Sequence, residues 1–158
     1  MDSHDGIREC GQTDTSATIA DEARDLRRYL SLIRVMAAAA AARELCRRGI
    51  PAPSGTWQYA RGWADLMREM RNARASDGPL SLDVVRMIAS GSSIDEPRRE
   101  IMEAGLLLSR MQHGFIPLDP CPSEEYQRGW EAACQALRES PEARLLVEAL
   151  AEVREGKR

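Results

Sequence analysis

Apolar residues recur at spacings of three and four along most of this chain, which is the period of an amphipathic helix. The first such pattern begins near Asp21, and one apolar stripe is formed by Leu26, Leu30, Ile33, Ala37 and Ala40. Residues 47–51 then combine two arginines, a glycine and a proline, which is typical of a helix end. Because no stretch keeps period-two alternation, we predict an all-α fold.

Turn signals divide the remaining sequence into five further segments of helical pattern. We predict helices over about residues 56–73, 81–90, 95–113, 123–139 and 140–156, with Thr56 and Ser123 as N-caps. Residues 1–20 are rich in glycine, serine, threonine and acidic groups, so we expect a flexible tail there. The other residues, 21–158, are enough for a single helical domain.

A five-residue motif occurs twice, at an offset of 67 residues. Its residues are Tyr59, Gly62 and Trp63 in the first copy and Tyr126, Gly129 and Trp130 in the second, with an arginine before each glycine. A glycine-proline turn precedes both copies. The repeat predicts two tandem, pseudo-symmetric three-helix units, over residues 21–91 and 92–156, that together form a six-helix bundle.

The spacing within the motif indicates what it does. The tyrosine and the tryptophan of each copy lie four residues apart, so they stack along one helix face. A glycine inside a helix costs about 1 kcal/mol relative to alanine, so its repetition predicts close contact with another backbone or with a ring. We interpret the motif as a packing device, with a partner anchor as the alternative. Trp57 lies outside the repeat and is the better surface candidate.

The motif also resembles helical segments of short phage and prophage accessory proteins, often written Tyr-x-x-Gly-Trp-x-x-Ala. Tyr126, Gly129, Trp130 and Ala133 match this full form, whereas Leu66 replaces the alanine in the first copy. The likeness covers about eight residues in each half and implies no catalytic residues. It implies a small mobile-element protein that acts by binding, such as an inhibitor of a host or defence (anti-CRISPR-type) complex.

Charge is distributed unevenly, although the formal net charge is only −3. Residues 27–74 carry ten arginines and three acidic groups, whereas the segments on either side are acidic. This basic segment predicts contact with an acidic protein surface or with phosphates. The residues that we expect to bind a partner are Arg47, Arg48, Trp57, Arg68, Arg71 and Arg74.

Composition argues against several enzyme classes. The four cysteines and two histidines show no zinc-ligand spacing, and Lys157 is the single lysine, so we expect no metal, no cofactor and no catalytic lysine. Catalytic serine elbows and phosphate-binding glycine loops do not occur. No apolar run approaches the roughly 20 residues of a membrane span, and the start of the chain does not read as a secretory signal. We therefore expect a cytoplasmic protein.

These observations favour a non-enzymatic module that occupies a macromolecular partner, with one half binding and the other bracing. A protein with an acidic surface is the partner we expect. A nucleic-acid-binding regulator that uses the basic face of residues 27–74 is the first alternative. A helical enzyme with a pocket between the halves is the second. Homodimerisation through the thin face of Ala37–Ala42 is left open.

Overall fold

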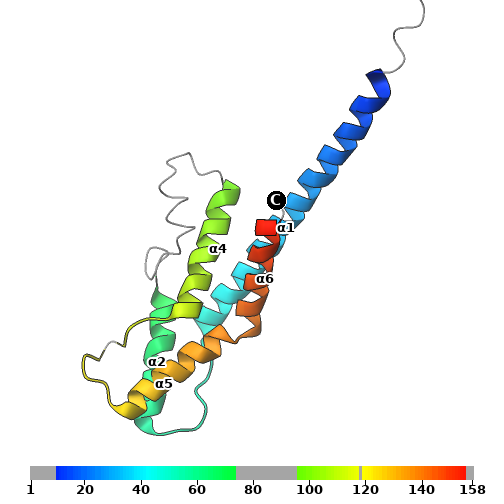
Figure 1. The fold of residues 1–158 in the computed structure, drawn as a ribbon. Helices are drawn as coiled ribbons and strands as arrows, with labels where there is room; N and C mark the ends of the chain where they lie inside the picture. Colours follow the sequence, from blue (N-terminus) through cyan, green and yellow to red (C-terminus); the bar gives the residue numbers. More distant parts are fainter. Residues whose placement is uncertain (1–9, 74–95, 118, 156–158) are drawn as a thin grey trace, which may run out of the picture.

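The computed structural model describes residues 10–73, 96–117 and 119–155, with side chains from residue 15 and again from residue 98. These residues form five helices and no strand: α1 (Cys10–Arg48), α2 (Trp57–Asn72), α4 (Glu96–His113), α5 (Glu124–Arg138) and α6 (Pro141–Glu155). Figure 1 shows α2 and α5 crossing at one end of the molecule, while α4 and α6 run beside α1. The all-α prediction is confirmed, whereas the helix expected over 81–90 lies outside the described residues.

The first helix is longer than the sequence pattern predicted. It begins at Cys10 and so includes half of the segment that we expected to be a flexible tail. Figure 1 shows its N-terminal part projecting well beyond the other helices. Threonine, serine, aspartate and glycine prevail in the added stretch, residues 10–20, and they favour a helix only weakly, so helix propensity does not account for the extension.

The other helix boundaries agree with the sequence to within one or two residues. The hydroxyls of Thr56 and Ser123 accept hydrogen bonds from the backbone N–H groups of Tyr59 and Tyr126, at 3.3 and 3.2 Å. Each bond satisfies a donor that the first turn of a helix leaves without an intrahelical partner. The two copies of the motif therefore start their helices in the same way.

The face that α1 buries differs from the stripe that the sequence suggested. Its core residues are Val35, Ala38, Ala39, Ala42, Leu45 and Cys46, which pack with α4 and α6. The predicted stripe is exposed instead, with 58% of the Leu26 side chain and 42% of Ile33 accessible. In α6, Leu146 and Leu150 are buried, whereas Leu145 and Val147 are exposed. The buried face of α1 thus includes three alanines, whereas the larger side chains of Leu26 and Ile33 stay exposed.

Among the residues that the structure describes, none of the helices combines the length and the apolar character that a membrane crossing requires.

Candidate functional site

The repeated glycines lie where α2 and α5 cross. A Cβ atom added to Gly62 would lie 2.1 Å from the carbonyl oxygen of Tyr126, and one added to Gly129 would lie 2.0 Å from that of Tyr59. Real Cβ atoms do not approach so closely, so each glycine admits the backbone of the opposite helix. The predicted backbone contact is confirmed, and it is reciprocal: each copy of the motif packs on the other.

The tryptophans of the motif fix the turns that precede their helices. The indole N–H of Trp63 donates to the carbonyl oxygen of Ile50 at 2.7 Å, and that of Trp130 donates to Phe115 at 2.8 Å. In each copy the tyrosine ring stacks on the tryptophan, with centroids 6.4 and 6.3 Å apart. The motif therefore connects the helix crossing to the loop before it.

Two glycines end the helices that lead into these turns. Gly49 after α1 has a φ of 75°, and Gly114 after α4 has a φ of 67°. Both lie in the left-handed region that favours glycine, and each donates its N–H to the carbonyl four residues earlier, at 2.7 and 2.8 Å. The same turn is thus formed twice in one chain.

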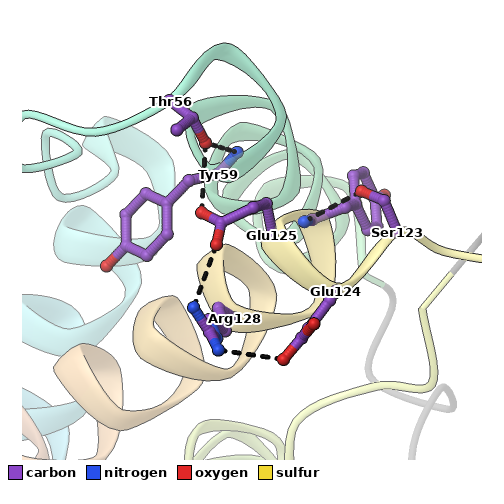
Figure 2. A network of polar contacts seen from close by, with 7 residues as sticks. Thr56, Tyr59, Ser123, Glu124, Glu125 and Arg128 are labelled. Carbon is purple, nitrogen blue, oxygen red and sulfur yellow. Dashed lines mark hydrogen bonds and ion pairs between the residues drawn. The ribbon is translucent and has the colours of Figure 1, made fainter.

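Polar contacts join the beginnings of α2 and α5 (Figure 2). The Thr56 hydroxyl donates to Glu125 at 3.2 Å, and Arg128 donates to Glu124 and Glu125 at 2.9 and 3.0 Å. These side chains are largely exposed, so their ion pairs add little to stability. They hold Arg128 against its own helix, and its charge is therefore already compensated.

A pocket of about 590 Å³ lies beside the first copy of the motif, between the end of α1, the following loop and α2. Its apolar lining comes from Ile50, Pro51, Ala52, Trp63, Ala64 and Met67. Four arginines also line it, namely Arg47, Arg48, Arg68 and Arg71. We call these four residues and this lining the arginine pocket. It brings together four of the six residues that the sequence singled out.

Two of these arginines have acidic neighbours. Glu44 accepts two hydrogen bonds from Arg47, at 2.9 and 2.6 Å, and this contact lowers the pKa of Glu44 and raises that of Arg47. Arg68 is paired with Asp65. Arg48 and Arg71 form no ion pair with any described residue. The pocket therefore keeps an excess of positive charge.

Asp65, which lines the arginine pocket, forms a hydrogen bond with the second half of the chain. Its carboxylate accepts a hydrogen bond of 2.6 Å from the hydroxyl of Tyr126, which is 1% exposed. Burial and this bond raise the pKa of Tyr126 to about 12, so the hydroxyl stays a donor at neutral pH. This bond could not be predicted from the sequence, because its two residues lie 61 positions apart.

The two other residues expected at the site do not join it. Trp57 is 70% exposed at the start of α2, and the guanidinium of Arg61 lies 5.6 Å from its ring centroid. It is not among the residues that line the arginine pocket, which lies along the later turns of α2. Arg74 lies outside the described residues.

Nucleophilic and metal-binding chemistry finds no support at the pocket. Cys46 lines it, but burial raises the pKa of its thiol to about 11, so the reactive thiolate is disfavoured at neutral pH. Within the described ranges, no three His, Cys, Asp or Glu side chains are grouped so as to hold a metal ion. What the pocket offers is cationic hydrogen-bond donors together with apolar side chains.

Comparisons with protein-family models, with curated proteins and with solved structures each found no match to this chain.

Proposed function

We propose that this protein is a non-enzymatic binding module that holds an acidic segment of a partner protein in the arginine pocket. The observation that carries the proposal is the convergence of four arginines, from the end of α1 and from α2, on one apolar hollow. Guanidinium groups bind carboxylates through paired, charge-assisted hydrogen bonds. Arg48 and Arg71, which form no ion pair with any described residue, are the main contacts.

The second half of the chain supplies an internal comparison. It forms the same glycine turn and the same tryptophan-to-carbonyl bond with a different set of side chains at the corresponding positions. These are Gln112, His113, Gln135 and Arg138 in place of Arg47, Arg48, Arg68 and Arg71. The turn and crossing therefore do not need four arginines, and helix-end electrostatics does not account for them. This difference supports a binding role for the first half and a structural, supporting role for the second.

The lining of the pocket favours a protein partner over a nucleic acid. It combines four arginines with apolar side chains, which suits a segment in which acidic side chains flank an apolar one. Binding of a phosphate backbone depends on the cations and makes no use of the apolar side chains. Trp57, the one strongly exposed tryptophan, also lies apart from the arginines, so no stacking groove for bases is formed here.

The proposal extends to the architecture. The reciprocal crossing of α2 and α5 supports two tandem units of three helices; the helix predicted over 81–90 as the third of the first unit lies outside the described residues. A cytoplasmic location and an origin in a phage or another mobile element remain predictions from the sequence. A role as an inhibitor of a host or defence complex is the form of binding that this origin would suggest.

Affinity capture from the native host tests the proposed function. The double variant Arg48→Glu/Arg71→Glu is expected to lose at least about nine-tenths of the partner that the wild type retains, equivalent to about 1.4 kcal/mol or more of binding free energy. Quantitative mass spectrometry of the retained proteins measures this loss. Nuclease treatment of the lysate separates protein from nucleic-acid partners, since a direct protein partner is retained after it.

The matched control is Arg28→Glu/Arg138→Glu, which changes the net charge equally on exposed positions of α1 and α5. It is expected to keep the partner. Equal retention by the two double variants would overturn the proposal, and so would a retained partner that disappears on nuclease treatment.

A further inference from the structure

The projecting helix α1 carries a second apolar face, on the side opposite its buried residues. We call it the coiled-coil face, and its members are Ile19, Ala23, Leu26, Leu30, Ile33, Ala37 and Ala40. All are exposed except Ala23, which is half-buried, and Ile19 is 61% accessible. An apolar face of this length, on a helix that leaves the bundle, is unusual for an isolated monomer.

The spacing of these residues specifies the kind of packing. Their positions alternate steps of four and three, which is a repeat of 3.5 residues over three heptads. Such a repeat keeps one apolar seam facing a partner helix as the two supercoil. No described residue covers the seam, since α4 and α6 pack on the core side of α1, and Figure 1 shows nothing beside its first part.

The charges beside the seam indicate which partner fits it. Glu22 and Tyr29 lie along one flank, and Arg27 and Arg34 lie along the other. In a parallel two-stranded coiled coil, a residue on the first flank faces the residue five positions later on the second flank of the other helix. Glu22 would then face Arg27 of the partner subunit, and Tyr29 would face Arg34 of the partner subunit.

The opposite orientation fits less well. In an antiparallel pair each second flank faces itself, so Arg27 would face not a carboxylate but Arg34 of the partner subunit, and Glu22 would lose its cationic partner; within its own chain Arg34 is already paired with Glu152. Glu22 and Arg27 form no ion pair with any described residue, and both are exposed. Their complementary charges and their five-residue spacing match a second copy of the same helix.

We propose that the chain forms a two-fold symmetric dimer in which the coiled-coil face pairs in parallel with that of a second copy. The alanines at positions 37 and 40, where the bundle adjoins α1, allow the two helices to approach closely there. The arginine pocket stays outside this contact, because none of its residues belongs to the coiled-coil face. The dimer thus presents two arginine pockets, one on each copy. This assembly is additional to the proposed binding of one partner segment by a single chain.

Sedimentation of the full chain tests the dimer. The wild type is expected to sediment as a dimer at micromolar concentration, and Leu26→Glu/Leu30→Glu is expected to be monomeric. The control Leu145→Glu/Val147→Glu introduces the same charges at exposed apolar positions of α6 and should stay dimeric. Circular dichroism checks that both variants remain helical. A monomeric wild type, or a dimer that survives the α1 substitutions, would overturn the proposal.

Charge reversal and cross-linking test the pairing itself. Glu22→Arg is expected to raise the dimer dissociation constant about tenfold, and addition of Arg27→Glu should restore it. In a Cys10→Ser/Cys121→Ser background, Ala23→Cys should form a disulfide between the copies, whereas Asp21→Cys, on the opposite side of α1, should not. Failure of Arg27→Glu to restore the dimer, or cross-linking by neither cysteine or by both equally, would contradict a parallel pair.

Discussion

Replacing Gly62 by alanine is expected to lower the free energy of unfolding by about 3 kcal/mol. The added Cβ would lie 2.1 Å from the carbonyl oxygen of Tyr126 and 3.1 Å from the backbone nitrogen of Trp130. Both atoms belong to a hydrogen-bonded helix, so neither can move without displacing α5. The gain in helix propensity, about 1 kcal/mol, opposes this loss but is smaller. Urea denaturation followed by circular dichroism measures the effect.

Gly129→Ala is the reciprocal change and should have a similar cost, because its Cβ would meet the carbonyl of Tyr59 at 2.0 Å. Either alanine forces the same two backbones apart, so the double variant should lose less stability than the sum of the losses in the two single variants. Ala41→Gly, at an exposed position of α1, is the control, since it exchanges the same two residue types in reverse and should cost only the helix propensity, about 1 kcal/mol. Losses below about 1 kcal/mol at both crossing glycines would contradict the close approach.

Replacing Trp130 by phenylalanine is expected to lower the free energy of unfolding by about 2–3 kcal/mol. The substitution keeps an aromatic ring beside Tyr126 but removes the donor to the carbonyl of Phe115, and it leaves a void where the indole was 2% exposed. The part-buried carbonyl of Phe115 would then lose the donor that compensates for its desolvation. Trp63→Phe should act in the same direction through Ile50.

Trp57→Phe provides the control within the same residue type. Its side chain is 70% exposed, so the change should stay within about 0.5 kcal/mol. Unfolding is followed by circular dichroism, because the substitutions alter tryptophan fluorescence itself. Equal stability losses at positions 57 and 130 would contradict the structural role of the repeated tryptophans.

The local features of the motif could be predicted because they depend on short spacings. Caps at Thr56 and Ser123, stacking at four residues and a glycine that admits a backbone all follow from the helix period. What the glycine would meet could not be predicted, since that depends on how two helices 67 residues apart cross. The reciprocal contact of Gly62 and Gly129 is therefore a finding of the structure.

The apolar pattern of α1 shows why burial is harder to predict than helicity. A spacing of three and four marks an apolar stripe, but this helix carries two of them. The alanine-rich one around Ala39 is buried, whereas the one with Leu26 and Ile33 is exposed. The prediction that the face with the larger apolar side chains is buried was wrong, because the bundle needs small residues where helices approach closely.

The candidate site was predictable in composition and not in arrangement. The basic segment and the arginines that we expected to bind could be located from the sequence, but not how they come together. The turn at Gly49 folds α2 back beside the end of α1, so Arg48 and Arg71 line one pocket. Asp65 was not singled out, because its role depends on a hydrogen bond from Tyr126 in the other half.

The central claim is that the arginine pocket of the first half binds acidic protein segments. Titration of the ¹⁵N-labelled chain with a short peptide, in which glutamates flank a leucine, tests it most directly by two-dimensional NMR. We expect chemical shift changes for the amides that line the pocket, such as those of Ile50, Ala64 and Met67, and none around Gln135 in the second half. These shifts should disappear in Arg48→Glu/Arg71→Glu. Shifts centred on the second half, or stronger binding of the same face by duplex DNA, would contradict it.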